Sequence, residues 1–202
     1  MKKVKATRAL TVTAVLTAMA VILSFFPKFK LPFLPSFLSL DFADLPALIG
    51  SFALGPLSGV IICLIKNLIG LFSSMTGGVG ELSNFIISAS FVLTAGIVYK
   101  YKHSFSGAII GATLGALLCT ALSLLTNYYL VYPIYYNVMS QEAVMNLYKA
   151  INPNVNTLWD ALLWFNAPFT FGRELLNVLI TFLIYKRITP LLKGTKNRKD
   201  EA

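Results

Sequence analysis

The polar and charged residues that could do chemistry in this chain lie inside or beside long apolar stretches. They are Asp41, Asp44, Lys66, Asn67, Glu81, Asn84, Asn127, Arg173 and Glu174. If these stretches cross a membrane, each ionisable group there costs about 2.5–3.5 kcal/mol, so it pairs with another group or lines a cavity. We therefore expect Lys66 to form a structural ion pair with Asp44 or Glu81. Arg173 and Glu174 are adjacent on one expected helix, so their side chains should point to different faces.

A second group of interest surrounds Asn127. Residues 127–136 read Asn-Tyr-Tyr-Leu-Val-Tyr-Pro-Ile-Tyr-Tyr and hold five tyrosines. One interpretation is an aromatic belt at a membrane–water interface. The other is a binding pocket, because an Asn amide offers a donor and an acceptor that match the imide-like edge of a planar heterocycle, while tyrosine faces cover its rings. The sequence leaves both interpretations open.

Residue sets typical of enzymes are missing from the sequence. It contains no Gly-x4-Gly-Lys-Ser/Thr phosphate-binding loop, no His-Glu-x-x-His motif, and a single histidine, His103, in a basic stretch. Cys63 and Cys119 both lie within apolar runs, so we expect them to be small buried hydrophobic residues. We therefore expect no catalytic residue, no metal ion and no cofactor.

The composition identifies the environment of these residues. Of the 202 residues 56% are hydrophobic and 12% are charged, whereas soluble domains carry about 25% charged residues. A soluble monomer of this length could not bury so much apolar surface. The net charge of +9 comes from bases at the ends of apolar runs, a placement typical of the positive-inside rule rather than of nucleic-acid binding. The sequence therefore predicts an integral membrane protein in a lipid bilayer.

The apolar runs predict an all-α fold, in which residues 1–202 form one membrane domain with six helices. The expected ranges are 9–26, 44–54, 56–72, 80–99, 105–135 and 158–191. Three prolines between residues 27 and 40 exclude a regular helix, so we expect a long ordered loop after the first helix. Asp44 is the predicted N-cap of the second helix, and Gly55-Pro56 separates that helix from the third. A polar stretch over 135–157 is expected to connect the last two helices.

The basic residues predict the orientation in the membrane. With six helices both termini lie on one side, which would carry twelve lysines and arginines, against Lys28, Lys30 and Lys149 on the other side. Because positive charge marks the cytoplasmic side, we expect both termini to be cytoplasmic.

Several motifs spread over all six expected helices resemble those of one family. They are the run from Leu40 to Ile49, Gly55-Pro56, Lys66-Asn67, Gly80-Glu81 with Asn84-Phe85, Asn127-Tyr-Tyr, Tyr132-Pro-Ile-Tyr135, and Tyr185-Lys-Arg with Pro190. In this combination the chain resembles the membrane-embedded S components of energy-coupling-factor (ECF) vitamin transporters, and among them the riboflavin-specific members.

The resemblance implies a riboflavin-binding subunit for vitamin uptake in a bacterial cell membrane, with riboflavin as substrate rather than cofactor. It also implies three partners, namely a transmembrane coupling protein and two cytoplasmic ATPase subunits, which agrees with the missing phosphate-binding loop. In the family, small residues spaced by four on the first helix face the coupling protein, and Ala14 and Ala18 match this pattern. An ordinary close-packed contact within the bundle is the alternative for these two alanines.

The resemblance places the ligand between the proline-rich loop and the last three helices. The residues expected to contact it are Leu40, Asp41, Ala43, Asn84, Asn127, Tyr128, Tyr132, Thr170 and Arg173. Asn127 and Arg173 would bond the polar edge of the isoalloxazine ring, with Thr170 nearby. Tyr128 and Tyr132 would enclose the ring. The ribityl hydroxyls would be bound by Asp41, the backbone near Ala43, and Asn84.

One departure from the family pattern bears on the ligand. The last helix of this group often begins Pro-Phe-Asn-x-x-Lys, whereas here Thr170 and Arg173 stand in place of the Asn and the Lys. Arg is a planar fork and Lys a point charge, so the two are not equivalent against a heterocycle edge.

Three alternatives stay open at this stage. The chain could be an S component for another vitamin or heterocycle. It could also be a proton-coupled carrier, or a small membrane enzyme, that uses Lys66, Glu81 and Arg173 as a charge relay. FMN remains open as a second flavin substrate, whose phosphate Lys28 or Lys30 would contact.

Overall fold

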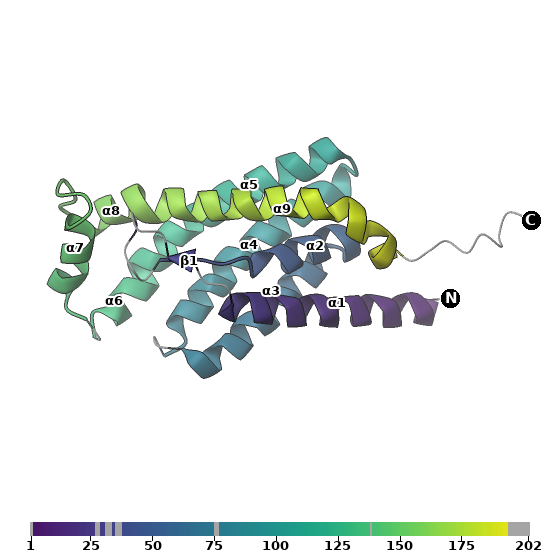
Figure 1. The fold of residues 1–202 in the computed structure, drawn as a ribbon, viewed down its shortest axis with the longest axis horizontal. Coiled ribbons are helices and arrows are strands. Elements are labelled where there is room, and N and C mark those ends of the chain that lie inside the picture. The colour runs from purple at the N-terminus through teal and green to yellow at the C-terminus, as the bar shows by residue number, and fades with distance from the viewer. Residues whose placement is uncertain are drawn as a thin grey trace, which may run out of the picture.

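The computed structural model describes residues 2–26, 29–30, 34, 38–74, 77–137 and 139–193, and helices make up nearly all of them (Figure 1). The α-helices are α1 (Lys2–Phe25), α2 (Asp44–Leu54), α3 (Pro56–Gly70), α4 (Val79–Tyr101), α5 (Phe105–Thr126), α6 (Tyr132–Tyr135), α7 (Gln141–Lys149), α8 (Leu158–Ala161) and α9 (Ala167–Lys193). A 3-10 turn, η1 (Leu71–Ser73), continues α3. Two π-helical segments, η2 (Asn127–Val131) and η3 (Leu162–Asn166), join α5 to α6 and α8 to α9.

Five helical segments in the described part of the chain are long and apolar enough to cross a membrane. They are Ala6–Phe25, Pro56–Ser73, Val79–Tyr101, Phe105–Tyr135 and Leu158–Ile184. The apolar helix α2 has only 11 residues, which is about 16 Å and roughly half of a hydrocarbon core. The all-helical fold expected from the sequence is therefore confirmed, while the number of membrane crossings stays a prediction.

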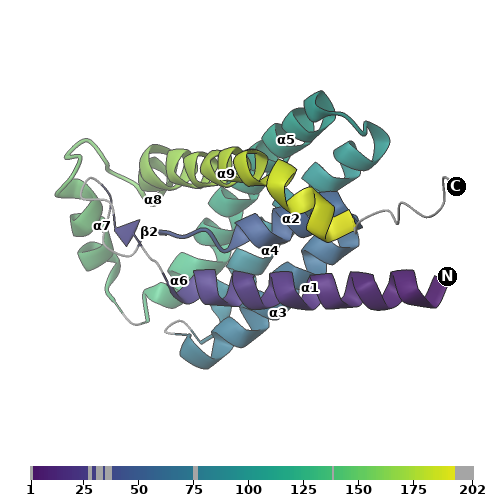
Figure 2. The same ribbon diagram turned by 45° about the vertical axis from the view of Figure 1, so that its right-hand side comes forward.

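Helix α2 is the centre of the bundle. Its residues from Asp44 to Phe52 are all buried, and it contacts α1, α3, α4 and α9. Figures 1 and 2 show α1 and α9 running along the molecule on either side of α2, with the start of α1 and the end of α9 at the same end. Because α2 is short and enclosed, its first residue, Asp44, lies inside the bundle. A carboxylate in that position needs positively charged partners from the neighbouring helices.

The prediction that Asp44 caps α2 is wrong. The N-cap position belongs to Ala43, which has no side-chain cap bond, and Asp44 is the first residue of the helix. The Asp44 carboxylate instead bonds Lys66 and Arg173. Two charged donors stabilise a buried carboxylate more than backbone amides do, because charge-assisted hydrogen bonds are roughly twice as strong as neutral ones.

The segment expected to be a loop after the first helix contains a small ladder. Strands β1 (Phe29–Lys30) and β2 (Ser39–Leu40) pair antiparallel, with Phe29 opposite Leu40. The ladder brings the two ends of the segment together, and β2 leads directly into Asp41 and α2. Lys28, which the sequence offered as a phosphate contact, lies outside the described residues.

The stretch expected to be a polar connection contains helix α7. Ser140 caps its start, since the Ser140 hydroxyl accepts a hydrogen bond from the Ala143 amide at 3.2 Å. The helix buries Val144, Met145 and Tyr148 on one side. Its other residues are mainly polar, so a search for long apolar runs overlooks it.

Helices α4 and α5 approach closely at Gly115, which gives a matched test of packing. A Cβ at Gly115 would lie 2.6 Å from the Phe91 carbonyl oxygen, whereas a Cβ at Gly172 would meet nothing within 4 Å. We expect Gly115→Ala to lower the free energy of unfolding by about 1–3 kcal/mol through overpacking. Gly172→Ala should raise it by up to about 1 kcal/mol, because alanine favours helix over glycine. Thermal unfolding in detergent measures both, and shifts of the same sign would contradict the close approach.

Candidate functional site

Two neighbouring cavities lie toward the end of the molecule where α6 and α7 are found. The first, here called the polar cavity, has a volume of about 150 Å³. Its walls are Ser24, Phe25, Asp41, Ala43, Lys66, Asn67, Gly70, Ser73, Glu81, Asn84, Ser88 and Arg173. This lining is rich in hydroxyl, amide and charged groups, so it suits a ligand portion that carries several hydrogen-bonding groups.

The second, here called the aromatic cavity, has a volume of about 370 Å³. Its walls are Leu38, Ser73, Gly80, Glu81, Ser83, Asn84, Ile87, Asn127, Val131, Tyr132, Tyr135, Val144 and Asn166. Ser73, Glu81 and Asn84 line both cavities. The two cavities are therefore adjacent compartments of one site, the larger with an aromatic and aliphatic wall and the smaller with a polar wall.

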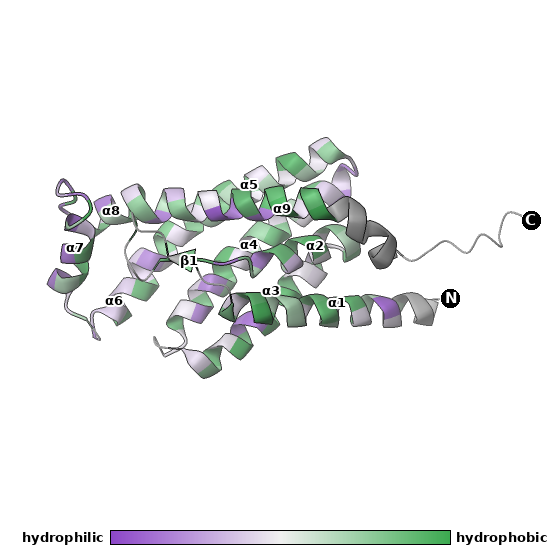
Figure 3. Cartoon of the chain, viewed as in Figure 1, coloured by the Kyte–Doolittle hydropathy of each residue, from purple (hydrophilic) through white to green (hydrophobic). Residues whose placement is uncertain are grey.

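A network of four charges, three of them buried and Arg173 partly buried, forms one side of the polar cavity. Lys66 Nζ lies 2.6 Å from Asp44 Oδ1, and Arg173 Nη2 lies 3.2 Å from Asp44 Oδ2. Arg173 also lies 2.7 Å from Glu174 Oε1. Two cations and two anions are thus paired, and the two cations are the members that line the cavity. Figure 3 shows hydrophilic bands on α3 and α9 in the middle of the bundle, consistent with this arrangement.

The expectation that Arg173 and Glu174 point to different faces is wrong. The Arg173 guanidinium folds back onto the carboxylate of its neighbour, where both Nε and Nη2 donate to Glu174 Oε1 at 3.0 and 2.7 Å. The Cβ atoms of adjacent helical residues point in different directions, but the arginine side chain is long enough to bend back and reach the carboxylate of Glu174. Glu174 is fully buried, and a buried carboxylate without a cation would cost several kcal/mol.

Glu81 lies at the junction of the two cavities rather than beside Lys66. Ser74 Oγ donates a hydrogen bond to Glu81 Oε2 at 2.6 Å, and the Gly78 amide donates to Ser74 Oγ at 2.9 Å. Asp41 lines the polar cavity, where its Oδ1 accepts a bond from the Ala43 amide at 3.1 Å. Of the two partners that the sequence offered for Lys66, the structure therefore brings Asp44 to it.

Asn127 is the first residue of the π-helical segment η2 and lines the aromatic cavity. Its Nδ2 donates to the Ser123 carbonyl oxygen at 2.7 Å and contacts Ser123 Oγ at 3.2 Å. Because a carbonyl oxygen only accepts, this contact fixes the amide orientation. Within the described part of the chain Asn127 Oδ1 has no hydrogen-bond donor, so an acceptor remains for a ligand.

Asn166 stands at the end of the second π-helical segment, η3, and lines the same cavity. The Tyr148 hydroxyl donates to Asn166 Oδ1 at 2.9 Å, and the Tyr132 and Tyr148 hydroxyls are hydrogen-bonded to each other. Burial raises the pKa of the Tyr148 hydroxyl well above its ordinary range, so it stays protonated and can donate. The Tyr132 hydroxyl is a second partner of the Asn166 amide. Because Nδ2 carries two protons, one N–H remains for a ligand in the same cavity as the acceptor of Asn127.

Four other residues predicted to contact a ligand have different positions. Tyr128 stacks on Trp159, with ring centroids 4.5 Å apart, and lines a separate surface hollow. Thr170 is buried, and its hydroxyl lies 3.2 Å from Ser123 Oγ. Leu40 lines an apolar groove beside α9, and Arg173 lines both that groove and the polar cavity. Arg173 and Asn127, expected at one ring edge, therefore face different compartments.

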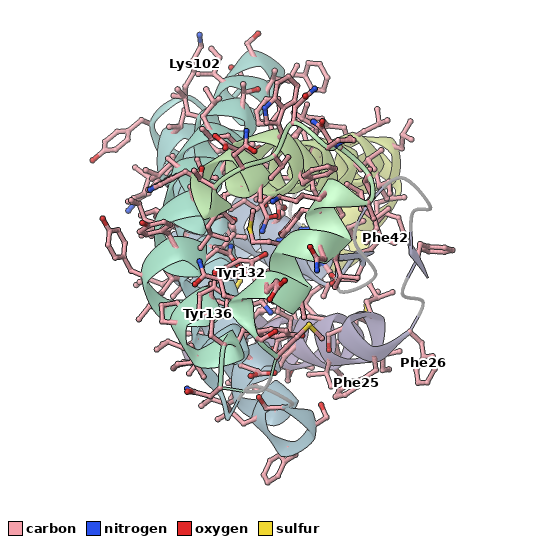
Figure 4. All side chains as sticks on the ribbon, turned by 90° about the vertical axis from the view of Figure 1, so that its left-hand side faces the viewer. Phe25, Phe26, Phe42, Lys102, Tyr132 and Tyr136 are labelled. Atoms are coloured by element: carbon pink, nitrogen blue, oxygen red, sulfur yellow. The ribbon has the colours of Figure 1, made fainter. Side chains whose placement is uncertain are left out.

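The end-on view shows how the aromatic side chains are distributed around this site. In Figure 4, Tyr132 and Tyr136 lie on one side of this end, and Phe42, Phe25 and Phe26 lie on the other. Tyr132 is 4% exposed, so it belongs to the interior wall rather than to a surface belt. Tyr129, by contrast, is 66% exposed. Different tyrosines of the segment are therefore compatible with the two interpretations, and both stay predictions.

Sequence reasoning missed Asn166 and Tyr148. Asn166 is the amide that directly precedes Ala167-Pro168, and it lies one helical turn before Thr170 on the same face. An amide inside an apolar span was the available signal, since such groups are costly and mark cavities. Tyr148 offered no comparable signal, because it lies in the stretch expected to be a connection.

The site holds chemistry for binding rather than for reaction. Among the described residues no group of three or more His, Cys, Asp and Glu side chains could hold a metal ion. The ionisable groups that line the polar cavity are paired with one another or hydrogen-bonded to neighbours. The arrangement is suited to holding a neutral ligand that has one planar and one hydroxyl-rich part.

Comparisons with known proteins agree on one family. The family model described as "ECF transporter, substrate-specific component" matches residues 8–185. The chain is 32% identical over 186 residues to the riboflavin transporter RibU of Staphylococcus aureus, covering 92% of this chain and 93% of that one. It is 28% identical over 193 residues to the riboflavin transporter FmnP of Bacillus subtilis, covering 94% and 96%.

A solved structure gives the same result for the fold. The S component of a bacterial ECF transporter superposes with a TM-score of 0.71 at 32% identity, covering 94% of this chain and 99% of the other. The chain thus resembles these proteins over nearly its whole length. The resemblance includes α1, where Ala14 and Ala18 are exposed, and the helices α2, α3 and α9 that carry the charge network.

Proposed function

This chain belongs to the family of substrate-specific components of ECF transporters, and from that membership we propose that it binds riboflavin for uptake across a bacterial cell membrane. The observation that carries the proposal is the pair of amides in the aromatic cavity. Asn127 leaves an acceptor and Asn166 leaves a donor on one wall. The pyrimidine edge of an isoalloxazine ring has an N3–H donor flanked by two carbonyl acceptors, which is the complementary pattern.

The two compartments fit the two parts of riboflavin. The flat ring system would occupy the aromatic cavity, between Tyr132, Val131 and Ile87. The ribityl chain, with its hydroxyl groups, would extend past Asn84 into the polar cavity toward Asp41. A buried hydrogen-bonding wall penalises any ligand that lacks the matching groups.

For Arg173 we propose a different role from the one that the sequence suggested. Its place in the polar cavity and its bonds to Asp44 and Glu174 support a role at the ribityl end rather than at the ring edge. There the guanidinium would donate to a hydroxyl while the two carboxylates hold it in position. FMN would bring its phosphate to the same end, since the phosphate is attached to the ribityl chain.

Transport driven by ATP requires partner proteins, because the sequence of this chain contains no phosphate-binding loop. We propose a transmembrane coupling protein and two cytoplasmic ATPase subunits, as the family implies. Ala14 and Ala18 are exposed on α1 and leave a shallow surface for a closely packed helix of the coupling protein. The ends of α1 and α9 that lie together in Figure 1 would face the cytoplasm, because the sequence places most lysines and arginines there.

Flavin fluorescence tests the substrate directly. Purified protein in detergent should quench riboflavin fluorescence with saturation at micromolar or lower concentrations, because a ring stacked in an aromatic pocket loses its emission. Other vitamins should not compete. If riboflavin fluorescence is unchanged while another vitamin binds, the family assignment remains and the substrate proposal fails.

A transport assay separates this proposal from the proton-coupled alternative. Vesicles that contain the chain with its coupling protein and ATPases should accumulate riboflavin only when ATP is present. Vesicles with the chain alone should accumulate none in a pH gradient, because Lys66 and Arg173 are already paired with carboxylates. Uptake by the chain alone in such a gradient would support the carrier instead.

A further inference from the structure

Two carboxylates that line the site, those of Asp41 and Glu81, do not belong to the charge network. Both residues are half-buried, and among the described residues neither forms an ion pair. We infer that these two carboxylates make the site selective for flavins whose side chain carries no negative charge, so that riboflavin is bound much more tightly than its phosphate ester, FMN. The inference rests on the proposed riboflavin function.

Each of the two carboxylates is held in the wall by a neutral donor. Asp41 Oδ1 accepts a hydrogen bond from the Ala43 amide at 3.1 Å, and Glu81 Oε2 accepts one from the Ser74 hydroxyl at 2.6 Å. Neither donor carries a charge, so the negative charge of each carboxylate is not cancelled. Glu81 lines both cavities and Asp41 lines the polar one. A flavin that occupies both cavities therefore passes one carboxylate and extends toward the other.

The cations in the same wall do not reverse this balance. Lys66 and Arg173 line the polar cavity, but the Asp44 carboxylate contacts both of them, and Arg173 also contacts Glu174. Asp41 is close enough to both cations to interact with them electrostatically. The described charges that line the polar cavity or belong to the network are thus four carboxylates and two cations, a formal charge of −2.

A ribityl hydroxyl and a phosphate respond differently to such a wall. The hydroxyl can donate a hydrogen bond to a carboxylate, and a hydrogen bond to a charged acceptor is a strong one. The phosphate brings about −1.5 to −2 charges at pH 7, and it meets like charges in a partly buried site where water screens them less than in bulk. Unpaired charges in a binding site reject one ligand without weakening another. Asp41 and Glu81 therefore favour riboflavin over FMN.

Three ligands that differ at the end of the ribityl chain test the role of charge. They are riboflavin, FMN and 5′-amino-5′-deoxyriboflavin, whose amine is protonated at neutral pH. Dissociation constants are measured by fluorescence quenching with the full chain in detergent, at one pH and one salt concentration. The wild-type protein should bind FMN about 10- to 100-fold more weakly than riboflavin, and the amino analogue at least as tightly as riboflavin. The readout is the ratio of each dissociation constant to that of riboflavin, because damage to the ring pocket weakens all three ligands together.

The variants change charge with little change in shape. Glu81→Gln and Asp41→Asn each remove one negative charge and keep an oxygen that can accept the existing hydrogen bond. Each should improve FMN binding relative to riboflavin by about five- to tenfold and weaken the amino analogue relative to riboflavin. Glu81→Asp keeps the charge and should keep the wild-type order of the ligands. Glu142→Gln is the matched control, because Glu142 is exposed on α7 and does not line either cavity, so both ratios should stay unchanged.

The outcomes separate this inference from the proposed function. If the wild-type protein binds FMN at least as tightly as riboflavin, the inference fails and the riboflavin proposal stands. The same holds if FMN binds weakly but Glu81→Gln and Asp41→Asn leave its ratio unchanged, since the size of the phosphate would then account for the difference. If the wild-type protein binds no riboflavin, the proposed function itself fails. Should one of the two variants not fold, the other carries the test, because each removes one of the two charges.

Discussion

Asp44→Ala is expected to lower the free energy of unfolding by about 3–5 kcal/mol, the usual cost of removing one partner of a buried ion pair. Asp44 holds two cations, Lys66 and Arg173, and is 1% exposed. Its loss leaves two positive charges and only one negative charge, that of Glu174, in the middle of the bundle. Thermal unfolding in detergent, followed by circular dichroism or by dye binding, measures the effect.

A second substitution, Lys66→Met, should restore part of the stability that Asp44→Ala loses. Lys66→Met added to Asp44→Ala removes the uncompensated cation and leaves the Arg173–Glu174 pair, which is neutral. The double variant should therefore unfold at a higher temperature than Asp44→Ala alone. Glu142→Ala is the control, since Glu142 is exposed on α7 and its removal should change the free energy by less than about 0.5 kcal/mol. A double variant whose loss equals the sum of the single losses would contradict the network.

Asn127→Ala is expected to weaken riboflavin binding by about 10- to 100-fold. In the proposed binding mode the variant removes the acceptor at the ring edge, so the N3–H of the ligand would be buried without a partner, at a cost of about 1–3 kcal/mol. Asn127 is half-buried and lines the aromatic cavity, so the variant changes the wall itself. Titration by fluorescence quenching gives the dissociation constants.

An N3-methyl analogue of riboflavin checks the cause. This ligand has no N3–H, so the wild-type protein should bind it more weakly than riboflavin, whereas Asn127→Ala should bind the two with similar affinity. Asn146→Ala provides the control, because Asn146 is exposed on α7 and should leave both affinities unchanged. Equal losses for both ligands in Asn127→Ala would place the ring edge elsewhere.

Hydropathy and helix breakers predict most of the bundle, because each is a local property of the chain. Gly55-Pro56 ends α2 and starts α3 where expected, and the second helix has the expected range of 44–54. The long helices extend a few residues beyond their apolar cores, since a helix continues into water as long as its residues tolerate it. The helix over 2–25 thus begins seven residues before the expected 9–26, within its basic segment.

The site could be predicted only in part, because its contacts depend on how the helices meet. Polar residues in apolar spans correctly marked Asp41, Asn84 and Asn127 as cavity-lining candidates. The pairing of Arg173 with its own neighbour depends on a side-chain conformation, and no spacing rule gives it. The contribution of α7 was hidden as well, since a helix with three buried residues out of nine resembles a polar connection.

The two π-helical segments have a consequence for how such proteins diversify. Adding or deleting one residue in an α-helix turns everything beyond it by about 100° and disrupts its packing, whereas a π turn is a place where one extra residue is already accommodated. Asn127 and Asn166 both belong to such turns. Gaps in the alignment of related chains should therefore gather at residues 127–131 and 162–166, where a one-residue change in length replaces a side chain that lines the aromatic cavity and spares the rest of the bundle.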